Sequence, residues 1–345
     1  MKAAALTGIK KIEIRDVPLP QLQNETDALL KTARVGICGS DIHYFLSSRV
    51  GDQNIGYPAI LGHECSAVVE KVGAKVTRVK PGDRVTIDPA VSCGSCDQCR
   101  SGRPHTCLNL RFLGYPGQME GCLREYFMMP EQNCFALPDR LTMTEGVLIE
   151  PLSIGLYALA HLEMMIGQAI AILGSGPIGL CLAHLAKTVR IEKIFMTDEV
   201  DERLAAARKI GATWAGNPEK DDIVREILNV EPAGLDAVFE CCGDQAALDQ
   251  AVELLKPGGQ LLIIGIPLLE RVSFDISGLR RKEIIVRNVR RQNRCTEKAV
   301  RLLEGEHLDV KFLATHRFRI EEVQEAFEIA SAYKDGVLKA LISFD

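Results

Sequence analysis

Four cysteines gather in one short stretch of this chain, and their type and spacing predict a metal site. The stretch is a glycine-containing loop, and the cysteines are Cys93, Cys96, Cys99 and Cys107. Four thiolates so close together can complete a tetrahedron around Zn²⁺ and leave no position for water, which is the arrangement of a structural site. A rubredoxin-like iron site is the alternative, but it would be expected to have two paired Cys-x-x-Cys hairpins, and this run lacks that pattern.

A second set of metal-type residues lies outside that run. Cys38 stands beside small residues, and Gly62-His63-Glu64 places an imidazole next to a carboxylate. Each motif alone is a weak signal, because a single cysteine or histidine more often packs in a core. With Glu150 as a further candidate, these residues predict a catalytic zinc ion, so that one chain would hold two zinc ions for two tasks.

A glycine motif predicts a dinucleotide site. Gly174-Ser-Gly176-Pro177-Ile178-Gly179 follows the apolar segment 169–173 and opens a helical stretch. The first glycine permits a tight turn, the second lets the backbone approach a pyrophosphate, and the third allows close helix–strand packing. The free N–H groups at the start of the helix hold the phosphates. An ordinary strand–helix turn is the alternative interpretation.

The choice of cofactor depends on Asp198, which ends the second predicted strand, nineteen residues after Gly179. Its carboxylate would accept hydrogen bonds from the ribose hydroxyls, and it would repel a 2′-phosphate. NAD is therefore favoured over NADP. Arg203 lies nearby and could relieve part of that repulsion, so NADP stays open as the less favoured cofactor.

Composition bounds the class of protein. The chain has 345 residues, which favours two domains, and Lys plus Arg number 41 against 46 for Asp plus Glu, a formal net charge of −5. This balance gives no general attraction to nucleic acid or to an anionic membrane. No apolar run approaches the roughly 20 residues that a membrane span needs. The N-terminus does not resemble a signal peptide, so we expect a cytoplasmic protein.

Cysteine usage fits the same location. Twelve cysteines in a large chain without an export signal favour metal ligation and buried thiols over disulfides. Five are assigned to zinc, and the adjacent Cys241 and Cys242 are expected to be packed thiols in or beside a strand.

The pattern of predicted elements changes near residue 150. Residues 1–150 read as short strands separated by turns, including strands at 28–35 and 66–72. From 151 to 289 strands alternate with helices, which predicts a parallel, doubly wound sheet. The strands are expected at 169–173, 193–197, 237–240 and 260–264, and the helices at 180–189, 202–210, 221–228 and 246–255, the last one stopping at Pro257-Gly258-Gly259. The part from about 290 is expected to hold helices at 296–304 and 320–330, an extended segment at 312–318 and a closing strand.

Taken in order along the chain, these motifs resemble those of the zinc-containing medium-chain dehydrogenases. The resemblance covers essentially the whole chain and rests on Gly62-His63-Glu64, Pro81-Gly82-Asp83-Arg84-Val85, the four-cysteine run, Gly174 to Gly179 and Thr315-His316-Arg317-Phe318. Cys38-Gly-Ser-Asp-Ile-His-Tyr44 and Glu150-Pro151-Leu152-Ser153 are most similar to the sorbitol (polyol) dehydrogenase branch. Alcohol dehydrogenases have a cysteine at the position of Glu150, and threonine dehydrogenases have Asp-Pro-Phe-Gly there.

The resemblance implies a fold and a domain plan. The fold class is α/β, with a β-rich, GroES-like catalytic domain and a Rossmann domain that binds NAD. The catalytic domain would comprise residues 1–150 and be completed by 290–345, with the Rossmann domain at 151–289.

The resemblance also implies a mechanism. Cys38, His63 and Glu64 would ligate the catalytic zinc with a water in the open position, and Glu150 would hydrogen-bond that water or approach the metal during turnover. Zinc in such a site is a Lewis acid that lowers the pKa of a bound alcohol. A hydride then passes to the nicotinamide. Ser40 and His43 would pass the released proton to solvent, although His43 could instead merely cap a turn.

Cofactor and substrate residues follow from the same resemblance. The cofactor set is Gly174, Gly176, Pro177, Ile178, Gly179, Asp198, Arg203, Ile264, Ile266, Val289 and Arg291. The substrate set is Tyr44, Glu150, Arg290, Arg291 and Gln292. Polyol dehydrogenases have Phe-Arg-Tyr where this chain has Arg290-Arg291-Gln292, so the arginine matches and its two neighbours do not.

The segment 280–294 is rich in basic residues and admits three interpretations. The first is a strand with solvated charges whose apolar face comes from Ile284, Ile285, Val286 and Val289. In the second, Arg290 or a neighbour binds an anionic group of the substrate, such as a phosphate or an acid. Nucleic-acid binding is the least favoured, because the whole chain is acidic.

The sequence therefore predicts an NAD-dependent zinc enzyme that oxidises a secondary hydroxyl of a polyol to a ketose. A smaller alcohol or an amino alcohol such as threonine is the alternative substrate, and the residues around Glu150 disfavour it. A catalytically silent cofactor-binding protein would be expected to have lost Cys38, His63 or Glu64, and all three are present. An interaction module built on the zinc lobe would leave most of the chain unexplained. The resemblance further implies a homotetramer built on dimers, or a homodimer.

Overall fold

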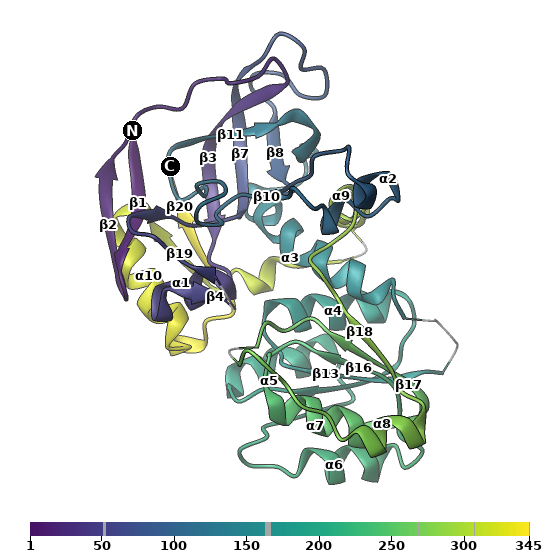
Figure 1. The fold of residues 1–345 in the computed structure, drawn as a ribbon. Coiled ribbons are helices and arrows are strands. Elements are labelled where there is room, and N and C mark those ends of the chain that lie inside the picture. Colours follow the sequence, from purple (N-terminus) through teal and green to yellow (C-terminus); the bar gives the residue numbers. More distant parts are fainter. Residues whose placement is uncertain (51–52, 163–166, 268, 307, 345) are drawn as a thin grey trace. The chain divides into compact units, whose positions relative to one another are not determined.

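The computed structural model describes residues 1–50, 53–162, 167–267, 269–306 and 308–344, and two compact units organise them (Figure 1). The first unit comprises residues 1–153 and 293–345, and the second comprises residues 154–292. The first unit is therefore built from two separate stretches of sequence, whereas the second is contiguous.

A seven-stranded sheet forms the centre of the first unit. Its strand order is β12-β8-β7-β3-β20-β19, and β11 also pairs with β3. These strands span β3 Asp27–Gly36, β7 Glu64–Val72, β8 Arg84–Ile87, β11 Tyr126–Pro130, β12 Cys134–Ala136, β19 His316–Arg319 and β20 Ala340–Ser343. Because β20 pairs with β3, the C-terminal stretch completes a sheet that the N-terminal stretch begins.

Smaller elements surround this sheet. The remaining strands are β1 Lys2–Gly8, β2 Lys11–Asp16, β4 Arg49–Val50, β5 Gln53–Asn54, β6 Ala59–Ile60, β9 Ala90–Val91 and β10 Arg111–Phe112. The α-helices are α1 Gly39–Ser47, α2 Asp97–Arg100, α9 Thr296–Glu304 and α10 Val323–Ser331, and α3 Met143–Leu159 runs from this unit into the second. Short 3₁₀ turns are η1 Pro104–Thr106, η2 Glu131–Asn133, η3 Lys311–Leu313, η4 Ile320–Glu322 and η5 Lys334–Gly336.

The core of the first unit joins both stretches of sequence. The rings of Phe45 in α1 and Phe327 in α10 lie 5.3 Å apart, and both side chains are fully buried. Aromatic pairs at this separation add to the stabilisation that burial provides. Helix α1, whose N-cap is Cys38, is thereby packed against α10.

The second unit is a six-stranded parallel sheet with the order β15-β14-β13-β16-β17-β18. Its strands are β13 Ala169–Leu173, β14 Lys193–Thr197, β15 Trp214–Gly216, β16 Leu235–Glu240, β17 Leu255–Ile263 and β18 Ile285–Asn288. The helices are α4 Pro177–Thr188, α5 Asp201–Ile210, α6 Ile223–Val230, α7 Gln245–Leu254 and α8 Ile276–Lys282. This is the strand order of a Rossmann fold, in which the order of the strands reverses between β13 and β16. All five residues of β13 are buried, as expected for a strand covered on both faces.

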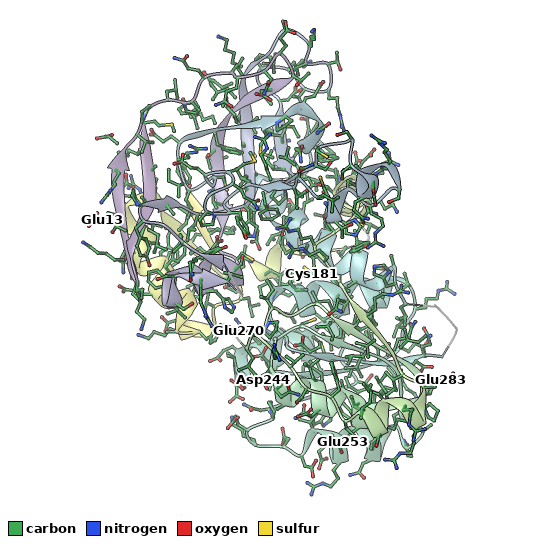
Figure 2. All side chains as sticks on the ribbon, viewed as in Figure 1. Glu13, Cys181, Asp244, Glu253, Glu270 and Glu283 are labelled. Carbon is green, nitrogen blue, oxygen red and sulfur yellow. The ribbon has the colours of Figure 1, made fainter. Side chains whose placement is uncertain are left out.

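Local sequence explains where several of these helices begin. The Asp244 side chain, labelled in Figure 2, caps α7 by accepting a hydrogen bond from the Ala246 N–H at 2.7 Å. Asp222 caps α6 in the same way through the Arg225 N–H. An aspartate at this position satisfies an N–H group that has no partner inside the helix.

Four details differ from the sequence-based expectations. Strand β17 begins at Leu255 and continues through Pro257-Gly258-Gly259, where its register against β16 shifts. The segment expected to be extended at 312–318 starts with the turn η3, and its strand begins only at His316. The first turn of the helix expected at 320–330 is 3₁₀. Strand β18 lies at the edge of the sheet with all four residues exposed, so Ile285 and Val286 do not form a buried apolar face.

None of the twelve cysteines, all of which lie in the described residues, forms a disulfide. Of the seven not assigned to zinc, Cys181, labelled in Figure 2 in α4, is buried, as are Cys65, Cys122, Cys134 and Cys295. Cys241 is half-buried. Cys242 is exposed, so the prediction that both adjacent cysteines are packed was wrong for this one. Cys242 follows the end of β16 and lies in a loop.

Among the residues that the structure describes, no helix combines the length and the apolar character needed to span a bilayer.

Candidate metal centres and cofactor site

The structure brings three of the predicted catalytic residues together. One ligand atom from each of Cys38, His63 and Glu64 lies within 4.8 Å of the others. The sheet explains this meeting, because β3 and β7 are antiparallel and Gly36, the last residue of β3, pairs with Glu64, the first residue of β7. Cys38 follows directly at the N-cap of α1, so both ligand segments lie at one end of the strand pair.

Asp41 fixes these segments relative to each other. One carboxylate oxygen accepts the Cys38 N–H at 3.0 Å, the other accepts the Gly62 N–H at 3.2 Å, and this second oxygen lies 3.7 Å from His63 Nδ1. Asp41 is 1% exposed. Burial lowers the pKa of His63, but the Asp41 carboxylate and the Cys38 thiol outweigh it and hold that pKa well above its ordinary value. The site therefore carries a negative potential that favours a cation.

Sequence analysis missed Lys339, which also belongs to this site. Its Nζ donates to Glu64 Oε1 at 2.8 Å and to the Ile37 carbonyl at 3.0 Å, and it lies 2.7 Å from Glu64 Oε2 at an angle outside hydrogen-bond geometry. Burial lowers the pKa of Lys339, but the attraction of Glu64, Cys38 and Glu150 outweighs it and raises the pKa above its ordinary value. The signal in the sequence was a lysine inside the apolar run 337–342.

Glu150 lies on α3 in the same unit and is buried, but it is not one of the three residues whose ligand atoms meet. Burial raises the pKa of its carboxyl group to about 7, and the charge of Glu64 adds to this rise, while His63 and Lys339 oppose it. Its place is thus that of a neighbour of the three-residue group. The role of hydrogen-bonding a water there stays a prediction.

The donor set suits a metal ion with an open position. Thiolate, imidazole and carboxylate are the three ligand types that zinc takes in catalytic sites, where three protein ligands leave the fourth position for water or substrate. The pocket around Glu64 is tight, because a Cβ atom on Gly36 would lie 2.6 Å from Glu64 Oε2 and 2.9 Å from a methyl group of Val147. The residues present therefore fit zinc.

The four-cysteine run forms a second, separate group, again with ligand atoms within 4.8 Å of one another. Cys96 Sγ lies 3.5 Å from Cys99 Sγ and 3.8 Å from Cys107 Sγ. In a tetrahedron with zinc–sulfur bonds of about 2.3 Å the sulfur atoms are about 3.8 Å apart. Backbone N–H groups of Ser95 and Cys96 lower the pKa of Cys93 to about 5, whereas burial raises the pKa of Cys99 to about 12, so a metal ion would have to displace the proton of Cys99 on binding.

The glycine motif in the second unit has the conformation that a phosphate-binding turn requires. Gly174 follows β13 with φ +104°, a left-handed conformation that disfavours other residues. A Cβ on Gly179 would collide with the Gly174 carbonyl oxygen, so close packing of helix and strand requires this glycine. Gly176 is the N-cap of α4 and Pro177 its first residue, and Ile178 follows half-buried. The turn thus places the N-terminus of α4 directly after the end of β13.

Asp198 lies at the end of β14, beside this turn. Its carboxylate accepts the Ser175 N–H at 2.8 Å and the Val200 N–H at 2.9 Å, and Arg203 Nη1 lies 3.7 Å away. The atom nearest to a Cβ built on Gly176 is the same Arg203 Nη1, at 3.8 Å. The arginine therefore lies between the acidic residue and the glycine turn, where it can contact a phosphate.

Comparison with known proteins gives the family. The family profile described as "Alcohol dehydrogenase GroES-like domain" matches residues 24–139, and the one described as "Zinc-binding dehydrogenase" matches residues 177–305. Sorbitol dehydrogenase of Bacillus subtilis is 36% identical over 343 residues, which cover 99% of this chain and 97% of that protein. The chain belongs to the zinc-binding dehydrogenases.

Two further relatives agree with this assignment. L-idonate 5-dehydrogenase of Vitis vinifera is 32% identical and covers 99% of this chain and 94% of its own length. The solved structure of an alcohol dehydrogenase from a Thermus species superimposes with a TM-score of 0.92 at 27% identity and covers 99% of both chains. The predicted fold class and family are thereby confirmed.

The other predicted site residues lie in several places within this zinc-binding dehydrogenase. In α1, Ser40 and His43 are half-buried and Tyr44 is buried. Burial lowers the pKa of His43. In the second unit the remaining residues follow the last strands of the sheet: Ile264 is half-buried, Ile266 exposed, Val289 buried, Arg290 exposed, Arg291 half-buried and Gln292 buried.

Sequence analysis also missed Glu240, the last residue of β16. Its side-chain Oε1 accepts the N–H groups of Cys242 and Gly243, and its carbonyl oxygen accepts those of Ile264 and Gly265. One buried residue thus joins the loops that follow β16 and β17, next to the point where the strand order reverses. An acidic residue that ends an apolar strand was the signal for it.

Proposed function

We propose that this chain is a zinc- and NAD-dependent polyol dehydrogenase that transfers a hydride from a secondary hydroxyl carbon to NAD and yields a ketose. The observation that carries the proposal is the meeting of Cys38, His63 and Glu64 in a chain that also contains a Rossmann sheet. The 36% identity to a sorbitol dehydrogenase over nearly the whole chain supports a polyol as substrate.

Cys38, His63 and Glu64 are proposed as the ligands of the catalytic zinc, and Cys93, Cys96, Cys99 and Cys107 as those of the structural zinc. Bound by the first set, Zn²⁺ supplies a Lewis acid that makes the proton of a substrate hydroxyl easier to remove. Asp41 keeps the cysteine and histidine segments in place through their N–H groups. Loss of residues that orient ligands in this way typically lowers metal affinity by about 10- to 100-fold.

The proton released from the substrate needs a path to solvent, and α1 offers one. Burial lowers the pKa of His43, so its imidazole is neutral near pH 7 and can accept a proton. Ser40 lies one helical turn earlier and can pass a proton between the site and this imidazole. Glu150, which is buried near Glu64 and His63, is proposed to hydrogen-bond the hydroxyl or water in the open position.

NAD is proposed as the hydride acceptor, held by the glycine turn and by Asp198. NAD supplies the redox chemistry of the nicotinamide ring, and the chain supplies its position. The Asp198 carboxylate favours free ribose hydroxyls over a 2′-phosphate. Arg203 lies 3.7 Å from that carboxylate and is the residue through which NADP could still be accepted.

A second candidate substrate class is an anionic polyol, either a sugar-alcohol phosphate or a sugar acid. Arg290, Arg291 and Gln292 stand where polyol dehydrogenases resembling this chain have Phe-Arg-Tyr, which adds one guanidinium group. Guanidinium groups bind phosphate and carboxylate oxygens in pairs. The relative that is an L-idonate dehydrogenase acts on a sugar acid, as its name states.

The experiment is a substrate panel followed by the appearance of NADH absorbance. It comprises free polyols, their phosphates, L-idonate, threonine and a small secondary alcohol, each with NAD and with NADP. Oxidation of polyols with NAD is expected, and the Cys38→Ser variant and the metal-depleted protein should both be inactive. Full activity after metal depletion would reject the mechanism, and preference for threonine or the small alcohol would reject the substrate class.

For assembly we propose a homotetramer built on dimers, with a homodimer as the alternative. Strand β18 is an edge strand whose Ile285 is 47% exposed and whose Val286 is 37% exposed, and an open edge with apolar side chains favours pairing with a second copy. Light scattering during size-exclusion chromatography measures the assembly, and a monomer would reject it. A cytoplasmic location is proposed as well, supported by twelve cysteines that form no disulfide, several of which must stay reduced to bind zinc.

A further inference from the structure

Lys339 is the one lysine or arginine that is buried among the residues that the structure describes, at 4% exposed. Lysines are almost never fully buried unless they are paired, because removing a charge from water is costly. Replacing a buried ion pair by apolar residues is often neutral or stabilising, so folding stability alone does not explain this one. The buried charge is therefore a candidate for a functional role.

The contacts of Lys339 point to the metal centre. Its Nζ donates one hydrogen bond to Glu64 Oε1 and one to the carbonyl of Ile37, the residue that precedes Cys38. The lysine thus joins the segments that carry two of the three proposed ligands. Its own position is fixed by β20, because the Ala340 carbonyl accepts the Ile37 N–H at 3.0 Å.

The Glu64 carboxylate has little freedom between these neighbours. On one side Lys339 Nζ lies within 2.8 Å of both oxygens. On the other side Oε2 lies against Gly36, where a Cβ would approach it to 2.6 Å. Lys339 donates its hydrogen bond to Oε1, while Oε2 has no hydrogen-bond partner among the described residues, so the lysine holds the carboxylate and leaves Oε2 as the oxygen that can be offered to a metal ion.

We infer that Lys339 is a positioning residue of the catalytic metal centre, which would orient the Glu64 carboxylate toward the metal and offset the negative charge that Cys38 and Glu64 place there. The inference rests on the proposed function only in so far as Cys38, His63 and Glu64 bind a metal, and it holds whichever alcohol is the substrate. Partners of ligating carboxylates orient them and tune the metal, and their loss typically costs about 10- to 100-fold in metal affinity.

The test measures metal binding in the full-length, metal-loaded protein. Lys339→Met removes the ammonium group and keeps most of the apolar stem, and Lys339→Arg keeps the charge. Lys282→Met is the matched control, because Lys282 Nζ likewise donates to backbone carbonyls, but these are the carbonyls of Val252, Glu253 and Leu255 in the second unit. The readouts are zinc release to a chelator and the d–d absorption of the Co²⁺-substituted protein.

The zinc ion at the group of Cys38, His63 and Glu64 is identified as the one that the Cys38→Ser substitution removes. In Lys339→Met this ion should be released to the chelator at least 10-fold more readily, whereas the zinc of the four-cysteine group is retained. The Co²⁺ spectrum should change in Lys339→Met, return toward that of the unmodified protein in Lys339→Arg, and stay unchanged in Lys282→Met. A lower melting temperature with unchanged zinc affinity and Co²⁺ spectrum would overturn the inference, because it would leave Lys339 a purely structural role.

Two further outcomes separate this inference from the proposed function. An unmodified protein that binds two zinc ions but oxidises no polyol would reject the proposed substrate and leave the metal-binding test of Lys339 valid. An unmodified protein whose Cys38 group binds no metal would overturn both. If Lys339→Met does not fold, Lys339→Gln takes its place, because glutamine is neutral and can still donate one hydrogen bond. Lys339→Gln should show a smaller loss of zinc affinity. Zinc affinity equal to that of the unmodified protein would overturn the inference.

Discussion

Replacing Gly36 by alanine is expected to weaken zinc binding at the group of Cys38, His63 and Glu64. The added Cβ would lie 2.6 Å from Glu64 Oε2 and 2.9 Å from Val147 Cγ1. Gly36 does not have a left-handed conformation, so the backbone itself accepts alanine without strain. The whole effect therefore comes from the collision with the carboxylate and with one valine methyl group.

The size of the effect follows from these distances. For an ordinary van der Waals contact the carboxylate oxygen must withdraw by about 0.8 Å, and productive ligand geometry tolerates displacements of only about 0.5 Å. Overpacking of a tight interior typically costs about 1–3 kcal/mol. If that cost falls on the metal-bound arrangement, zinc affinity drops by roughly 5- to 150-fold, at about 1.4 kcal/mol for each factor of ten.

Competition with a chromogenic chelator measures the loss, and Gly39→Ala is the matched control. Gly39 lies three positions further along the chain, beside Cys38, and a Cβ there meets nothing within 4 Å. Zinc affinity should fall in Gly36→Ala, stay unchanged in Gly39→Ala, and stay unchanged at the four-cysteine group in both. If Gly36→Ala keeps the affinity of the unmodified protein, then Glu64 does not ligate zinc from the position described above.

Three further predictions concern separate parts of the molecule. Cys96→Ser should lower the zinc content from about two ions to about one per chain, and native mass spectrometry that still finds two ions would contradict a four-cysteine site. Asp198→Ala should lower the preference for NAD over NADP by roughly tenfold or more, and steady-state kinetics with unchanged discrimination would reject its ribose contact. Burial raises the pKa of Glu150 from 4.5 to about 7 in the metal-free protein, so its contribution to stability is present below pH 4.5 and is lost as the pH rises through 7. Glu150→Gln should remove this loss of stability, which is on the order of 3 kcal/mol. The measurement is urea unfolding of the metal-free protein at several pH values, and an equal pH dependence in the unmodified protein and in Glu150→Gln would contradict the prediction.

The parts of the site that sequence could predict are those in which neighbours in the chain are also neighbours in space. The four cysteines lie on one loop, and the glycine turn and Asp198 belong to one strand–helix–strand unit, so their spacing alone indicates what they bind. Asp41 could have been found by the same logic, because it lies three positions after the N-cap Cys38, where an acidic side chain reaches back to the N-cap N–H.

Lys339 could not be predicted in this way, because 275 residues separate it from Glu64 and only the pairing of β20 with β3 brings the two together. Register against a distant strand is a tertiary property that no local pattern encodes. The same holds for Pro257-Gly258-Gly259, which local propensity marks as a break. Pairing with β16 nevertheless keeps the strand running across this segment, with a shift in register.

The discontinuous first unit imposes an order on biosynthesis. The contiguous unit of residues 154–292 can fold as soon as it leaves the ribosome, whereas the sheet of the other unit lacks β19 and β20 until residues 316–343 have been synthesised. The nascent chain therefore exposes Cys38, His63 and Glu64 long before Lys339 arrives. If Cys38, His63 and Glu64 bind zinc as proposed, the ion meets the complete site only after β20 has paired with β3.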